Sequence, residues 1–231
     1  MRPLILLDFD GVLFNSAYEA YQVCENTARE RNEYRKGVTF DEFMEFRGHL
    51  TDAWQFCRLY QSDRILNDFS TLRLIKPDDN DWIFNKRFFA QRAKMMMDEN
   101  WAKLMSPFPF FYQLRPLMGK YPDTFKILST RNVASIVRTL EYFEMTGIEV
   151  FGQEQIREYG SKLDVAIHMK WLDGSRYVAY IDDMNSHLEP FESAVDFCIH
   201  ADWGYDKSQA NSYTQGQAFQ VLSGILRIAY E

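Results

Sequence analysis

The sequence predicts an α/β protein in which helices cover both faces of a central parallel sheet, with a long helical segment inserted near the start. Three observations lead to this prediction. Short apolar runs alternate with helix-like segments through the second half of the chain. The first run, Leu4–Leu7, is apolar at every position, which is typical of a strand buried on both faces. Residues 16–105 show helical periodicity and no convincing strand pattern.

The helical segment is predicted to contain four helices. The first covers Ala17–Arg31, where small and apolar side chains follow one face. Thr39 and Glu42 have the spacing of a capping box at the start of the second helix. The third covers Asp52–Tyr60, and the fourth covers Asp81–Met105 after a turn rich in Pro, Asp and Asn. This segment, residues 16–105, is predicted to form a domain of its own.

Residues 1–15 and 106–231 are predicted to form the domain that contains the sheet. Further strands are expected at Thr124–Leu128, Ile148–Phe151, Tyr177–Ile181 and Val195–His200. Helices are expected at Phe111–Lys120, Val133–Thr146, Lys162–Leu172, Asn185–Ala194 and Gln217–Tyr230. Because strands joined by helices run parallel, the carboxyl ends of these strands should meet at one edge of the sheet.

Composition excludes several classes of protein. The formal net charge of −7 over 231 residues argues against a general nucleic-acid binder or a protein of acidic membrane surfaces. No apolar stretch reaches the ~18 residues that a membrane-spanning helix needs. The three cysteines, Cys24, Cys57 and Cys198, lack zinc-site spacing and suggest reduced thiols in a cytoplasmic protein. We expect no nucleic-acid or membrane partner, and the sequence does not indicate an oligomeric state.

Carboxylates follow two of the predicted strands. Asp8 and Asp10 come after the first strand, and residues two apart in an extended chain project to the same side. Asp182 and Asp183 follow the strand at Tyr177–Ile181. If the strands are neighbours, two carboxylates ~4 Å apart repel by roughly 4 kcal/mol at an effective dielectric of ~20. A cation would relieve this repulsion, and Mg²⁺ suits oxygen ligands and substrate phosphate.

Hydroxyl and lysine side chains occupy other element boundaries. Ser129 and Thr130 end a strand just before a helix, where a phosphate can be bound. Lys162 opens a helix, a position where the macrodipole disfavours a cation. Each feature also has an ordinary structural interpretation. The two hydroxyls can be helix caps, and the lysine can be a solvated surface residue.

The acidic pairs have structural alternatives as well. Asp10-Gly11 is a good turn signal for a β-hairpin formed by Leu4–Phe9 and Val12–Phe14. Asp182-Asp183 can cap the helix predicted at Asn185–Ala194.

Four short motifs together resemble those of the haloacid dehalogenase superfamily. They are DFDGV at Asp8–Val12, ILST at Ile127–Thr130, GSK at Gly160–Lys162 and YIDD at Tyr180–Asp183. The resemblance extends from Leu4 to about Tyr205. It implies a Rossmann-like three-layer core and identifies residues 16–105 as a helical cap domain, as in the phosphoglycolate phosphatase and β-phosphoglucomutase branch.

The resemblance also implies catalytic roles. Asp8 would be the nucleophile that forms an aspartyl-phosphate, and Asp10 would protonate the leaving oxygen and later activate water. Ser129, with Thr130 as the alternative, would bind a phosphoryl oxygen. Lys162 would hold Asp8 and the phosphoryl group together.

A metal site is implied by the same motifs. Mg²⁺ would bind the Asp8 carboxylate, the Asp10 backbone carbonyl and Asp183, with Asp182 as a direct or outer-shell partner. Because Asp10 supplies an acid that a departing halide does not need, the resemblance favours phosphoryl transfer. We therefore expect a Mg²⁺-dependent phosphatase that acts on a small phosphorylated metabolite. The alternatives are a phosphomutase of the same family and a non-catalytic phosphate-binding protein.

Substrate recognition beyond the phosphate is expected from the helical segment. Arg47 and His49 interrupt two helices where capped relatives place a substrate-reading loop, although a turn with solvated charges has the same appearance. Arg131, just after the second motif, is a candidate contact for the substrate anion.

We predict that Arg47→Ala or His49→Ala changes kcat/KM for the preferred phosphate ester, because a contact beyond the phosphate distinguishes substrates. Steady-state kinetics over a panel of phosphorylated metabolites measures the effect. Unchanged constants for every accepted substrate would rule out a recognition role for both residues.

Overall fold

The computed structural model describes residues 2–32, 34–50, 52–61, 75–172, 177–207 and 212–230. The chain forms two compact units. Unit 1 comprises Met1–Asn15 and Ser106–Glu231, and unit 2 comprises Ser16–Met105. No helix within the described ranges combines the length and apolar character needed to cross a membrane.

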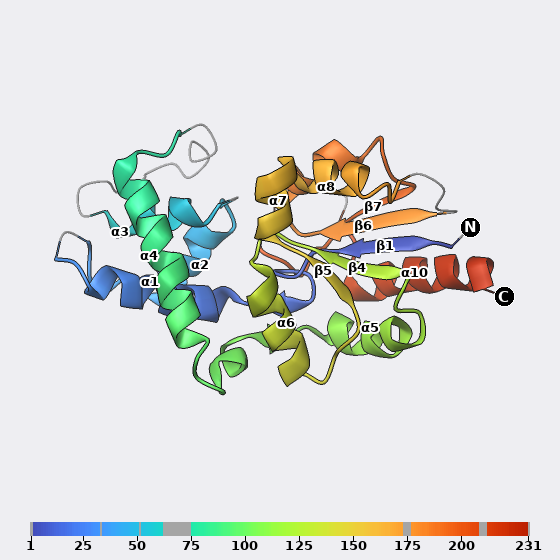
Figure 1. Ribbon diagram of the computed structural model, residues 1–231, viewed down its shortest axis with the longest axis horizontal. Helices are drawn as coiled ribbons and strands as arrows, with labels where there is room; N and C mark the ends of the chain where they lie inside the picture. The colour runs from blue at the N-terminus through green and yellow to red at the C-terminus, as the bar shows by residue number, and fades with distance from the viewer. Residues whose placement is uncertain are drawn as a thin grey trace. The chain divides into compact units, whose positions relative to one another are not determined.

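Unit 1 is built on a five-stranded parallel sheet with the order β5-β4-β1-β6-β7 (Figure 1). The strands are β1 (Leu4–Leu7), β4 (Phe125–Leu128), β5 (Glu149–Phe151), β6 (Val178–Asp182) and β7 (Phe197–His200). The apolar β1 is central and all of its residues are buried, as its composition predicts. The α/β class with a parallel sheet and additional helices is therefore confirmed.

Helices cover both faces of this sheet (Figure 1). One face carries α5 (Pro109–Lys120), α6 (Val133–Tyr142) and α10 (Gln215–Tyr230). The other carries α7 (Gln153–Tyr159), α8 (Lys162–His168), α9 (Asn185–Leu188) and the short 3-10 helix Glu189–Phe191. Unit 1 is thus a three-layer core.

Alternation along β1 decides which residues face which layer. Leu4 and Leu6 lie in one buried cluster with Val165 and Ala166 of α8. In a strand every second side chain projects to the same face, so the residue at position 8 continues the row that faces α8. The packing of β1 therefore determines the direction of the first acidic residue after it.

The hairpin interpretation of Asp10-Gly11 is wrong, because β1 pairs in parallel with β4 and β6 and not with the residues that follow it. The chain turns tightly instead: Gly11 has φ +83° and its N–H donates to the Phe14 carbonyl at 2.9 Å. A positive φ of this kind is readily adopted by glycine, which lacks a Cβ. Two short strands then pair antiparallel, β2 (Phe14–Asn15) and β3 (Ser106–Pro107).

Several helix boundaries differ from the sequence predictions. The helix predicted to run to Met105 ends at Met95, and residues from Trp101 form a separate 3-10 helix, Trp101–Leu104. Between them the Asp98 carboxylate accepts the Asn100 N–H at 2.9 Å, a local turn that competes with helical hydrogen bonding. Helix α7 was not predicted, and none of its residues is fully buried, so it lacks the apolar stripe that identifies helices.

The elements described in unit 2 are helices. They are α1 (Ala17–Arg29), α2 (Phe40–Arg47), α3 (Phe56–Tyr60), α4 (Asp79–Met95) and the 3-10 helices Ala53–Gln55 and Trp101–Leu104. The capping box predicted at the start of α2 is confirmed: the Thr39 hydroxyl accepts the Glu42 N–H at 3.2 Å, and the Glu42 carboxylate accepts the Thr39 N–H at 2.8 Å. Helices α1 and α4 pack against each other.

A buried ion pair joins α1 to α4. Arg92 donates from Nε and Nη2 to the two carboxylate oxygens of Glu19, at 2.9 and 3.0 Å. Trp101 Nε1 donates to the same carboxylate at 3.3 Å. Both charged side chains are buried and compensate each other, and the indole N–H gives the Glu19 carboxylate a further hydrogen bond. Such a bidentate arrangement fixes the register of two helices.

We predict that Glu19→Ala lowers the free energy of unfolding of unit 2 by about 3–5 kcal/mol, because it leaves the Arg92 guanidinium buried without its counter-charge. Chemical denaturation followed by tryptophan fluorescence measures the change, with Trp101 as a local reporter. The exposed pair Arg2–Asp123 supplies the control, since Asp123→Ala should cost under about 1 kcal/mol. Equal losses for the two variants would contradict the role assigned to the buried pair.

Candidate functional site

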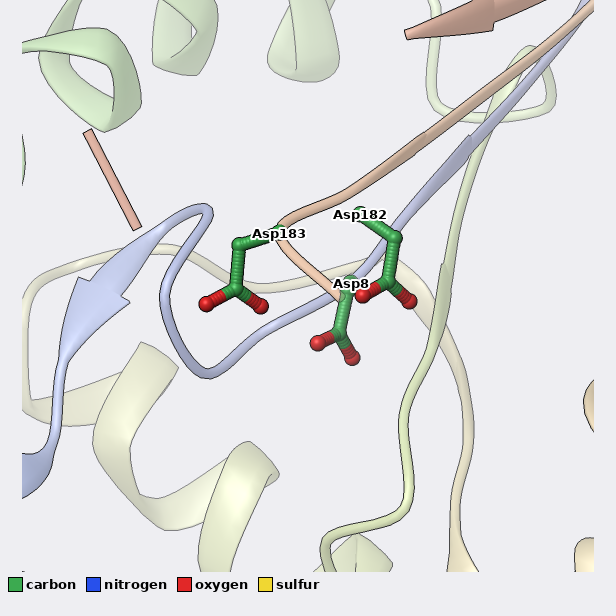
Figure 2. Close-up of side chains that lie close together, drawn as sticks. All are labelled: Asp8, Asp182 and Asp183. Carbon is green, nitrogen blue, oxygen red and sulfur yellow. The ribbon is translucent and has the colours of Figure 1, made fainter. Parts of the chain in front are cut away.

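Three aspartates meet where β1 and β6 end. Asp8 directly follows β1, Asp182 is the last residue of β6, and Asp183 comes next. The two strands are hydrogen-bonded neighbours, and the Asp8 N–H donates to the Ile181 carbonyl at 2.9 Å. Figure 2 shows the three side chains directed to one place, and each offers an oxygen within 4.8 Å of the others. All three residues are buried.

Lys162 joins the cluster from the helical layer that packs on this face of the sheet. It is the first residue of α8, one turn before the Val165 and Ala166 side chains that pack on the sheet. Its Nζ lies 3.0 Å from Asp8 Oδ1 and 2.6 Å from Asp182 Oδ2. The residue is 5% exposed, so the alternative of a solvated surface lysine is wrong.

The pKa values reflect this crowding. Burial raises the pKa of Asp8 to about 6, although the Lys162 ammonium opposes the rise. Burial alone would raise the pKa of Asp182 too, but Lys162 and His187 outweigh it and hold that pKa well below its usual range. Burial would lower the pKa of Lys162, but Asp182 and Asp8 outweigh it and raise the pKa above the ordinary value. The lysine therefore remains protonated between two carboxylates.

The Asp182 carboxylate has partners on both oxygens. Besides Lys162, the buried Tyr180 hydroxyl donates to Oδ2. The Met184 N–H donates to Oδ1 at 2.8 Å, and His187 Nδ1 lies 3.3 Å from the same atom. A carboxylate engaged in this way is suited to fix Lys162, and its oxygens are less available to a metal ion than those of Asp183.

Asp183 occupies a cradle that side chains would fill. A Cβ placed on Gly11 would lie 2.2 Å from Asp183 Oδ2, and one on Gly204 would lie 2.1 Å from Asp183 Cβ. The Tyr205 N–H donates to Oδ2 at 2.6 Å. Two glycines and one backbone N–H thus determine where this carboxylate lies.

The charges of the cluster fit a divalent cation. The carboxylates of the two acidic motifs carry four negative charges when ionised, and the buried cations Lys162 and Arg131 offset two of them. Two carboxylates at 4.8 Å repel by roughly 3–4 kcal/mol at an effective dielectric of ~20. Hard divalent cations prefer oxygen ligands of this kind, and the buried triad of Asp8, Asp182 and Asp183 can bind one.

Asp10 and Ser129 of the second motif both contact Arg131. Asp10 is half-buried, and its Oδ1 accepts a hydrogen bond from Arg131 Nη1 at 3.0 Å. Ser129 is fully buried, and its hydroxyl oxygen accepts the Arg131 N–H at 3.4 Å, while Thr130 is half-buried. The residue that caps α6 is Asn132, so neither hydroxyl is the helix cap that the structural alternative required.

The capping alternative for the second acidic pair is also wrong. The N-cap of α9 is Met184, and the first N–H of that helix, at Asn185, donates to Asp206 Oδ2 at 3.3 Å, not to either aspartate of the pair. Arg47 ends α2 and His49 follows it in unit 2, where Arg47 is half-buried and His49 is exposed. Their role in recognition stays a prediction.

Three contributors to the site were not assigned a role from the sequence. Tyr180 could have been found from strand alternation, since it lies two residues before Asp182 and must face the same layer. Gly204 stands in a turn that the resemblance includes, but its closeness to Asp183 depends on the fold. Ser135, whose hydroxyl oxygen accepts a hydrogen bond from Arg131 Nε at 2.8 Å, has no sequence signal, because a serine in a first helical turn is common.

No known family model matches the chain. No curated protein matches it either. Solved structures, however, match it over nearly its full length.

A haloacid dehalogenase-like hydrolase from Streptococcus pneumoniae is 15% identical, with a TM-score of 0.62 over 96% of this chain and 98% of that one. A predicted phosphatase from Clostridium acetobutylicum is 10% identical, with a TM-score of 0.67 over 97% and 99%. A predicted phosphoglycolate phosphatase from Haemophilus somnus is 13% identical, with a TM-score of 0.61 over 90% and 88%. The chain therefore has the fold of the haloacid dehalogenase-like hydrolases, as its four motifs predict.

Proposed function

We propose that the chain is a Mg²⁺-dependent phosphatase that hydrolyses a small phosphorylated metabolite through an aspartyl-phosphate on Asp8. The observation that carries this proposal is the contact of Lys162 with Asp8 and Asp182 beside Asp183. A buried carboxylate held by an ammonium, next to a site for a divalent cation, is equipped to attack an anionic phosphoryl group. The names of structures with this fold, which include predicted phosphatases, agree with it.

In the proposed reaction an Asp8 oxygen attacks phosphorus and forms the P–O bond of the aspartyl-phosphate. The bond from phosphorus to the leaving oxygen breaks, and Asp10 gives that oxygen its proton. Water then attacks the phosphorus, and Asp10 takes the proton from it. The P–O bond to Asp8 breaks, which releases inorganic phosphate and restores the carboxylate.

The remaining residues bind and orient the phosphoryl group. Lys162 stays charged and supplies positive charge where the transition state is anionic. Ser129, or Thr130 as the alternative, binds a phosphoryl oxygen. Asp182 keeps Lys162 in position through its hydrogen bond.

A divalent cation fits beside Asp8 and Asp183, with the Asp10 backbone carbonyl as a further ligand and Asp182 at least as an outer partner. When bound, it supplies charge neutralisation between the nucleophile and the phosphoryl group. Unit 2 is proposed to be the cap domain, with Arg47 and His49 as candidate contacts for the rest of the substrate.

We predict that Asp8→Asn lowers the hydrolysis of 4-nitrophenyl phosphate by about 10³-fold or more, because the amide cannot act as the nucleophile. Acid quenching during turnover of a ³²P-labelled ester should trap label on the wild-type chain and none on the variant. Asp123→Asn, a change at an exposed aspartate, is the control and should retain full activity. An active Asp8→Asn enzyme would contradict the mechanism. A wild-type chain inert on a broad panel of phosphate esters would favour a binding role.

We further predict that Gly204→Ala raises the Mg²⁺ concentration needed for half-maximal activity about 10-fold or more, because the added methyl displaces Asp183. Titrating Mg²⁺ into EDTA-treated protein measures this, and circular dichroism checks the fold. Gly224→Ala is the matched control, since open space surrounds that glycine within α10. Identical Mg²⁺ titrations of both variants would show that Asp183 does not bind the metal.

A further inference from the structure

Arg131 is bound to the proposed acid–base residue. Its Nη1 donates to Asp10 Oδ1 at 3.0 Å, and the arginine side chain is 1% exposed against 16% for the aspartate. The pair links the turn after β1 to the segment after β4, two regions separated by more than a hundred residues of sequence. The sequence suggested only that Arg131 contacts the substrate anion.

The guanidinium is oriented from its other edge as well. Arg131 Nε donates to Ser135 Oγ at 2.8 Å, and the Ser135 hydroxyl donates to the Asn132 carbonyl at 2.9 Å. The guanidinium carbon also lies 5.7 Å from the centre of the Phe9 ring, within the range of a cation–π contact. A planar group held at both edges and along one face has little freedom to reorient.

We propose that Arg131 is a positioning residue for Asp10, and that it places this carboxylate for proton transfer to the leaving oxygen. The inference rests on the proposed phosphatase function. A general acid must stay within hydrogen-bond reach of the leaving atom, and the Arg131 contact limits rotation of the Asp10 carboxylate. Arg131 holds Oδ1, so the carboxylate keeps one orientation while it gives its proton to the leaving oxygen and then takes a proton from the attacking water.

This role differs from a phosphate contact in one measurable way. A phosphate contact acts on a group that all substrates share. The placement of Asp10 matters only when the leaving oxygen needs a proton. The two roles therefore separate when esters with similar shapes but different leaving groups are compared.

The test compares 4-nitrobenzyl phosphate, an alkyl ester whose leaving oxygen needs a proton, with 4-nitrophenyl phosphate, whose leaving oxygen does not. The value of kcat/KM reports steps up to formation of the aspartyl-phosphate. We expect Arg131→Met to lower kcat/KM about 100-fold or more for the benzyl ester and less than about 10-fold for the phenyl ester. Arg131→Lys should recover part of the loss.

Two further variants show whether Arg131 acts through Asp10. Asp10→Asn should give the same selective loss, and the double variant Asp10→Asn/Arg131→Met should lose no more than Asp10→Asn alone. Ser135→Ala removes the hydroxyl that orients the guanidinium without removing a charge. Ser135→Ala should lower kcat/KM by a smaller factor, again more for the benzyl ester than for the phenyl ester. It therefore provides the test if Arg131→Met does not fold.

Arg115→Met is the matched control, because it removes an arginine of α5 that contacts the Phe143 carbonyl and Glu144. It should leave both kcat/KM values unchanged. Equal losses for the two esters in Arg131→Met, or additive losses in the double variant, would overturn the positioning role and leave the phosphatase proposal intact. Failure of the wild-type chain to hydrolyse these two esters and every ester of the broad panel would contradict the phosphatase proposal itself, and the positioning role with it.

Discussion

The contact between Lys162 and two buried aspartates is the interaction on which the site depends. Asp8 follows β1 and Asp182 ends the adjacent β6, so the sheet forces their carboxylates together out of water. Without a cation between them, burial and mutual repulsion would favour protonation, and a protonated nucleophile cannot attack phosphorus. The ammonium counters this directly, and the carboxylates in turn keep the lysine charged. The layer that carries α8 is thus part of the chemistry.

The second constraint on the site is the limited space around Asp183. A Cβ at either Gly11 or Gly204 would overlap Asp183, and these two glycines come from segments far apart in the sequence. The turn after β1 and the loop after β7 therefore have to meet at this aspartate. Tyr205 from the same loop donates its N–H to the carboxylate. The position of the Asp183 carboxylate is thus set by backbone atoms, which are held more rigidly than a network of long side chains.

The acidic site also shows how two buried cations can take different roles. Lys162 and Arg131 are both buried cations paired with aspartates, but they come from opposite sides of the cluster. Lys162 neutralises charge at the proposed nucleophile. Arg131, with its planar fork, orients the carboxylate that exchanges protons. The difference follows from geometry: an ammonium is a point charge, whereas a guanidinium held at two edges fixes direction.

Much of the fold and of the acidic cluster could be predicted from residue patterns. The apolar run before Asp8 predicts a central buried strand, and the alternation of strands with helices predicts the parallel sheet. The positions of Asp8, Asp182 and Asp183 at strand ends then predict an acidic cluster, because parallel strands end at one edge of a sheet. Lys162 was noted because a cation is disfavoured at the start of a helix, but its role at the site was implied by the resemblance of GSK at Gly160–Lys162 to a family motif. The strand inferences rely on local periodicity, which the sequence carries directly.

Only the tertiary structure decided the rest. The partner of Arg131 and the cradle around Asp183 join segments that no local pattern connects. The short α7 lacks the buried stripe that would have revealed it. Periodicity shows which face a residue occupies within its own element. Which atoms meet across elements depends on how strands and helices pack, and a hydrogen-bond partner is chosen at that level.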